Sequence, residues 1–150
     1  MTITKDDRTT DVGLYHFAQS YRLAADFLEN GPDRPHSTHP EEPRDFLYIH
    51  AIELYLKAFL RLQGKTVDDL KAIGHDIPKL AKLVAGYGVI LDVQVGGILE
   101  LLTFENVFGA RYIVTGYYHR ASTAGLKHAA AELHAIVRAA LRDSGRVCGD

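Results

Sequence analysis

Residues 44–63 constrain the fold more than any other part of the chain. They contain no glycine or proline and are apolar almost all round, and Gly64 follows them directly. A helix that is apolar on every side has to be buried, and glycine commonly ends helices. The sequence therefore predicts a central helix over residues 44–63, with other elements packed around it.

Two further long segments have the pattern of amphipathic helices. Residues 14–28 and 123–142 repeat apolar side chains at intervals of three and four, which is the spacing of one helical face. Asp11 is a candidate N-cap for the first of them. Residues 92–108 also favour a helix, although residues 89–95 are compatible with an extended strand as well.

Short helices are expected between these long segments. Thr66 is a good N-cap for residues 67–73, which Gly74 would end. Asp76 is a good N-cap for the next helix, which has a proline in its first turn and a stop at Gly86 or Gly88.

The elements sum to one all-α domain over residues 1–150, an up-and-down bundle of four long helices plus a short helix. Four of the five prolines fall within residues 30–43, so residues 31–43 are predicted to form a loop. Residues 144–150 are expected to form a tail. His36 and His39 in the loop lack a fixed scaffold, so any metal that they take would be adventitious.

Composition limits the classes of function. The chain has 17 Lys and Arg against 19 Asp and Glu, so it lacks the overall positive charge that drives non-specific DNA binding, and any nucleic-acid contact must be local. A single cysteine, Cys148, indicates no disulfide framework. No apolar stretch approaches the roughly 20 residues of a membrane span, and the N-terminus is polar. We therefore expect a cytoplasmic protein without a membrane partner.

The central helix carries a narrow polar stripe. At about 100° per residue, one line along this helix includes Phe46, His50, Glu53, Lys57 and Leu60. Because an unpaired buried charge is costly, these polar groups must face solvent, pair with each other, or face a ligand or a second subunit. A solvated ion pair is as good an interpretation as the other two together. The stripe supplies two metal ligands at most, so we predict neither a metal site nor a cofactor.

Several segments together resemble one known family. The run from His50 to Ala58 reads HAIELYLKA, Gly64 follows it, residues 74–77 read GHDI, and residues 110–112 read ARY. In order and spacing this chain looks like the HEPN superfamily of helical domains, over most of its length. The resemblance implies a compact helical bundle that pairs as a homodimer, with a cleft between the subunits.

The resemblance also implies a function. Many HEPN domains are metal-independent endoribonucleases of toxin–antitoxin, defence or RNA-processing systems, and others bind nucleotides or partner proteins without catalysis. Catalytic members have an Arg, about four to six further residues, and a His before the last helix. Arg111 and His119 match these types, with seven residues between them. An antitoxin or a nucleotidyltransferase is the kind of protein partner implied.

Candidate RNA- or nucleotide-binding residues are His50, Glu53, Lys57, Tyr112, Tyr117 and Arg120. The tyrosines suit base stacking, but equally suit a core or a dimer seam. Arg111 would contact RNA, or would instead pair with an acid such as Glu53 to hold the bundle together. Asp76 and His75 are assigned to capping and orienting a helix turn.

The preferred hypothesis is a dimeric HEPN-like domain that binds RNA or a nucleotide and cleaves RNA through Arg111 and His119, in a stress or defence system. The alternative is a non-catalytic dimerisation or protein-interaction module, in which the Arg, Glu, Lys and His cluster is structural.

Overall fold

The computed structural model describes residues 2–103 and 121–149, and all regular structure within these ranges is helical. The helices are α1 (Lys5–Arg8), α2 (Asp11–Asn30), α3 (Glu41–Leu62), α4 (Val67–Ile73), α5 (Ile77–Ala85), α6 (Val93–Leu101) and α8 (Thr123–Asp143). The predicted all-α class is therefore confirmed for the described part of the chain. No helix in these ranges combines the length and apolarity needed to cross a membrane.

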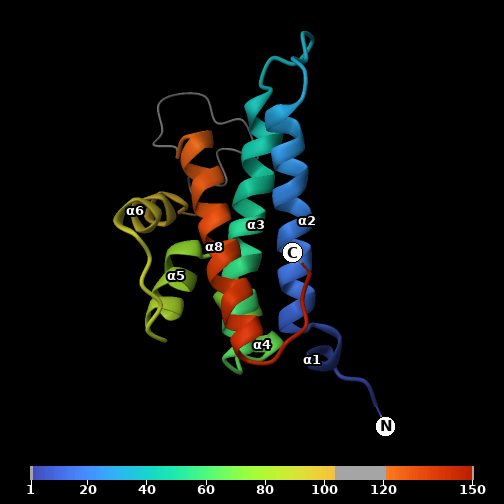
Figure 1. The fold of residues 1–150 in the computed structure, drawn as a ribbon, viewed down its shortest axis with the longest axis vertical. Helices are drawn as coiled ribbons and strands as arrows, with labels where there is room; N and C mark the ends of the chain where they lie inside the picture. Colours follow the sequence, from blue (N-terminus) through green and yellow to red (C-terminus); the bar gives the residue numbers. More distant parts are fainter. Residues whose placement is uncertain (1, 104–120, 150) are drawn as a thin grey trace.

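Helices α2, α3 and α8 are long and lie side by side, while α5 and α6 lie on the opposite side of the bundle from α2 (Figure 1). Helix α3 is central and contacts α2, α8, α5 and α4. Helices α3 and α8 run in the same direction, since Thr123 at the start of α8 donates a hydrogen bond to Asp45 near the start of α3. The predicted up-and-down arrangement of four long helices is therefore not confirmed.

The core forms where α3 meets its neighbours. Half of the α3 side chains are buried, including Tyr48, Ile52, Tyr55, Leu56 and Leu60. They pack against buried apolar side chains of α2 and α8, such as Tyr15, Leu133 and Val137. The apolar circumference predicted for residues 44–63 is thus explained by neighbours on several sides of this helix.

Local capping signals produce the short helices as predicted. The Thr66 side chain accepts a hydrogen bond from the Asp69 backbone N–H, and the Asp76 side chain accepts one from Lys79. Gly74 ends α4 with φ +68°, a conformation that glycine adopts without steric cost. These contacts are local in sequence, which is why the pattern alone predicts them.

The starts of two long helices differ from the prediction. Helix α2 begins at Asp11, and its N-cap is Thr10 rather than Asp11. Helix α3 begins at Glu41, so Pro43 lies in its first turn and the predicted 31–43 loop is shorter. Proline is tolerated there because the first backbone N–H groups of a helix have no partner within the helix.

Helix α6 begins at Val93, one residue after the start of the predicted 92–108 segment, and it ends at Leu101, earlier than predicted. Residues 104–108 lie outside the described ranges. Residues 89–92 are irregular, so neither interpretation of the 89–95 segment holds along its whole length. The sequence analysis missed α1, a single turn that Thr4 and Asp7 hold through reciprocal hydrogen bonds.

Candidate functional site

The candidate site is built around Glu53, a charged residue in the buried middle of α3. Glu53 is 4% exposed, and the Lys57 ammonium donates a hydrogen bond to its Oε1 atom at 2.8 Å. The two residues are one helical turn apart, with the acid first, which is the favourable order. The predicted pairing of Glu53 with Lys57 is confirmed, and the pair is mostly buried rather than solvated.

A histidine from another segment joins this pair. The His75 Nδ1 atom lies 2.7 Å from the same Glu53 Oε1, yet the His75 side chain is 60% exposed. Gly74 turns the chain between α4 and α5, which places His75 over α3. A carboxylate at Nδ1 holds an imidazole in one orientation and favours the tautomer with the proton on Nδ1. Most of the ring surface stays open to solvent.

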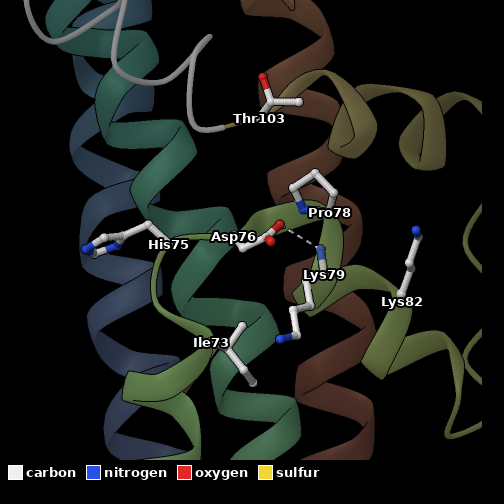
Figure 2. A pocket seen from close by; sticks show the side chains of 7 residues that line it. All are labelled: Ile73, His75, Asp76, Pro78, Lys79, Lys82 and Thr103. Carbon is white, nitrogen blue, oxygen red and sulfur yellow. Dashed lines mark hydrogen bonds between the residues drawn. The ribbon is translucent and has the colours of Figure 1, made fainter.

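An open pocket of about 810 Å³ lies beside His75 (Figure 2). Its lining residues are Ile73, His75, Asp76, Pro78, Lys79, Lys82 and Thr103. In Figure 2, His75 and Lys82 lie at opposite edges, and Asp76 lies between them with its carboxylate toward the backbone nitrogen of Lys79. The Asp76 carboxylate is thus engaged in capping α5 as predicted.

The charges of this region favour an anion. Lys79 and Lys82 are exposed and one turn apart on α5, and Pro78 and Ile73 supply apolar surface between them and α4. Lysine ammonium groups bind phosphates as mobile point charges, and an oriented imidazole can donate or accept a proton. The arrangement can therefore hold a phosphate near a histidine that Glu53 orients.

The residues of the predicted polar stripe do not form one connected cluster. Glu53 contacts both Lys57 and His75. The His50 ring instead lies edge-on against Tyr21, with centroids 4.4 Å apart, and parallel to Phe46 at 6.2 Å. Leu60 is fully buried in the core. The position of a residue on a helix sets the direction of its side chain. The packing of the neighbouring helices determines which groups that side chain contacts.

Five predicted site residues lie outside the described ranges: Arg111, Tyr112, Tyr117, His119 and Arg120. The predicted catalytic pair and the pairing of Arg111 with Glu53 therefore remain predictions. Within the described part of the chain, Lys57 and His75 each contact Glu53 Oε1.

Sequence reasoning missed His75, Lys79 and Lys82 as members of the site. His75 was assigned to the turn before α5, because its contact with Glu53 joins residues 22 positions apart. The available signal was the GHD turn itself, which places a titratable ring at a glycine-ended helix. The sequence pattern also gave no indication that Asp92, His128 and Glu132 lie together.

Comparisons with known proteins do not add an assignment. No family model matches the chain, and neither the curated proteins nor the solved structures contain a match to it.

Proposed function

We propose that this chain is a HEPN-like domain that binds RNA or a nucleotide, with a phosphate held in the pocket beside His75. The observation that carries the proposal is that His75, Lys79 and Lys82 all line one open pocket, with His75 and Lys82 at its opposite edges. The buried Glu53 carboxylate supports the proposal, because its contact with Nδ1 orients His75 and leaves most of the side chain exposed. The ELYLKA and GHD segments that suggested the HEPN resemblance supply Glu53 and His75, and the two lysines follow on α5.

Metal-independent RNA cleavage is the reaction that we propose for this domain. It needs a base for the 2′-OH proton, an acid for the leaving oxygen and a cation for the charge on the phosphorus centre. Arg111 and His119 are the proposed catalytic pair. His75 is a proposed binding residue, since it lines the phosphate pocket and is held by Glu53. A stress or defence role, with an antitoxin or nucleotidyltransferase partner, belongs to the same proposal.

Binding is tested by fluorescence anisotropy with a 5′-labelled single-stranded RNA at several salt concentrations. The Lys79→Gln/Lys82→Gln variant is expected to bind about 10-fold more weakly and to lower the salt slope by roughly 1.4, at about 0.7 per lost phosphate contact. The matched control is Lys5→Gln/Arg8→Gln, which removes two exposed charges from α1. Equal losses in both double variants would refute a specific pocket.

Cleavage is tested with labelled structured and single-stranded RNAs in EDTA. We expect the wild type to cleave and both Arg111→Ala and His119→Ala to lose cleavage while remaining folded by circular dichroism. His75→Gln should weaken RNA binding without abolishing cleavage at saturating protein. A folded wild type that binds RNA but leaves every substrate intact would retain the binding function and remove the nuclease.

A specific observation also favours the second candidate, a dimerisation module. Phe17 and Phe27 on α2 are 66% and 76% exposed, and Leu23 is exposed between them. The exposed residues of this face include no Asp, Glu, Lys or Arg, and they are Gly13, His16, Phe17, Ser20, Leu23, Ala24 and Phe27. Large and small side chains alternate along this face, so two copies can pack it against itself across a twofold axis without charge repulsion.

The dimer is tested by light scattering after size-exclusion chromatography. We expect the wild type to be a dimer and Phe17→Asp/Phe27→Asp to be a folded monomer. The matched control, Ile90→Asp/Val93→Asp, places two charges at exposed apolar positions on the other side of the molecule and should stay dimeric. A monomeric wild type at about 100 µM, or a dimer that the α2 variant leaves intact, would exclude this face.

A further inference from the structure

Three potential metal ligands meet where α6 begins against α8. His128 and Glu132 are one turn apart on α8, and Asp92 is the N-cap residue of α6. The His128 Nε2 atom lies 3.4 Å from Asp92 Oδ2 and 3.6 Å from Glu132 Oε2. One ligand atom from each residue lies within 4.8 Å of the other two. This group is separate from the Glu53 and His75 site.

Each carboxylate is held by one oxygen and presents the other to His128. The Asp92 Oδ1 atom accepts a hydrogen bond from the Val95 backbone N–H at 2.8 Å, which leaves Oδ2 facing the imidazole. The Glu132 Oε1 atom accepts from the Asp92 backbone N–H at 3.5 Å, while Oε2 faces the imidazole. Such backbone contacts orient metal-binding carboxylates in known sites.

The spacing of these atoms agrees with the size of a zinc coordination shell. Zinc binds His nitrogen and carboxylate oxygen at about 2.0–2.2 Å in tetrahedral geometry, so neighbouring ligand atoms are about 3.3–3.6 Å apart. The two distances from His128 Nε2 fall at this spacing. Mg²⁺ and Ca²⁺ prefer shells made only of oxygen, whereas an imidazole selects zinc and its neighbours in the transition series.

Close packing around the cluster keeps the two helices together. A Cβ atom on Gly125 of α8 would lie 3.1 Å from Ile98 Cδ1 of α6, so a glycine allows the helices to approach at this point. Ile98 is itself mostly buried. The ligands from α8 and from the start of α6 are thus carried by elements that are already packed against each other.

We propose that Asp92, His128 and Glu132 form a binding site for one Zn²⁺ ion, which links the start of α6 to α8. Three protein ligands leave a fourth position of the tetrahedron for water, because Asp92 and His128 are about half exposed. The bound ion replaces the mutual repulsion of two carboxylates with two attractive contacts. It also restrains α6, which is followed at Thr103 by the rim of the phosphate pocket.

The test is isothermal titration of the full chain with ZnCl₂ after treatment with EDTA and removal of the chelator. We expect one Zn²⁺ per chain and a rise in Tm with added zinc, and no such effect with MgCl₂. His128→Ala and Glu132→Gln should each weaken zinc binding at least about 10-fold. Asp92→Asn should weaken it as well while preserving the helix, because Asn is as good an N-cap as Asp.

The matched control is His36→Ala/His39→Ala, which removes two exposed histidines from the proline-rich loop. This variant should bind zinc as tightly as the wild type. A wild-type Kd above about 1 mM would overturn the proposal. Binding that survives His128→Ala, or that only the loop variant loses, would also overturn it. The readouts are independent of RNA binding, so failure here leaves the proposed function untouched.

Discussion

The two sides of α3 bury polar groups in different ways. Toward α2 and α8, the Tyr55 hydroxyl accepts a hydrogen bond from Arg22 Nε at 3.0 Å and lies 3.1 Å from His134 Nδ1. Toward α5, Glu53 pairs with Lys57 and with the mostly exposed His75. The members of the first network are buried or partly buried, with Asp26 the more exposed of its ion pair at 25%, whereas the second ends in an imidazole that is 60% exposed.

This difference separates polar groups that hold the bundle from polar groups that are available to a ligand. In the closed network Tyr55 of α3 contacts Arg22 of α2 and His134 of α8, so the hydrogen bonds connect three helices. Asp26 of α2 extends the network, because it pairs with Arg22 and accepts a hydrogen bond from Tyr48. A fully satisfied buried network makes one packing arrangement rigid and specific. The open network makes fewer contacts between helices, and it leaves His75 accessible to solvent beside the pocket.

The largest expected effect is on the closed side, at Tyr55. Replacing this fully buried side chain with alanine leaves a cavity among three helices and should lower the free energy of unfolding by about 3–5 kcal/mol. Tyr55→Phe removes only the hydroxyl and should cost about 1–3 kcal/mol, because Arg22 and His134 lose a partner. Urea unfolding followed by circular dichroism measures both. A loss below about 1 kcal/mol for Tyr55→Ala would contradict the closed network.

On the open side, the expected effect is smaller and depends on which partner of Glu53 is removed. Lys57→Met leaves the buried carboxylate with His75 alone and should cost about 2 kcal/mol, less than a fully buried pair because Lys57 retains some exposure. The double variant Glu53→Gln/Lys57→Met should be more stable than the sum of the single losses predicts, by about 1–2 kcal/mol. Denaturant unfolding of all four proteins completes the cycle, and strictly additive losses would show that the pair is not coupled.

His75→Gln is the contrasting variant in this comparison. His75 is 60% exposed, so its loss should change the free energy of unfolding by less than about 0.5 kcal/mol. The same variant should weaken RNA binding in the anisotropy assay. A large loss of stability would place His75 with the structural groups rather than with the ligand-binding ones.

The expected effect at Tyr48 differs from the others because it depends on pH. Burial, together with the hydrogen bond to Asp26, raises the pKa of Tyr48 above its ordinary value of 10.0. The unfolded chain then ionises first, so this contribution to stability is complete below pH 10 and is lost as the pH rises beyond it. Tyr48→Phe should cost about 1–2 kcal/mol at pH 7.

The prediction for Tyr48 is tested by the dependence of the free energy of unfolding on alkaline pH. Above pH 10, the wild-type free energy of unfolding should fall more steeply than that of Tyr48→Phe, by up to about 1.4 kcal/mol per pH unit. Burial also raises the pKa of Tyr55, to about 12, so part of the alkaline decline should persist in the variant. If the free energy of unfolding falls equally steeply for both proteins above pH 10, Tyr48 ionises as readily in the folded chain as in the unfolded one.

The sequence predicts the helices well where the cause of a boundary is local. Thr66 and Asp76 cap helices within three residues of themselves, and Gly74 ends α4 through its own backbone conformation. The start of α3 was placed three residues late, because the prolines of the loop conceal that Pro43 fits the first turn of a helix.

Contacts between site residues could likewise be predicted only where the two residues are close in sequence. Glu53 and Lys57 are four residues apart on one helix, so their contact could be predicted from periodicity. His75 reaches Glu53 from 22 residues away, and Asp92 reaches His128 from 36 residues away. Such contacts depend on how separate helices pack, which periodicity within one helix does not specify.

The sequence by itself determined the helical class, the central place of α3 and most helix ends, since these arise from 3.6-residue periodicity and from hydrogen bonds at helix termini. Only the tertiary structure decided that α8 runs parallel to α3, that Glu53 pairs with His75, and that Asp92 meets His128 and Glu132. The physical reason is that a helix fixes the direction of each side chain, whereas the partner depends on packing between elements distant in sequence.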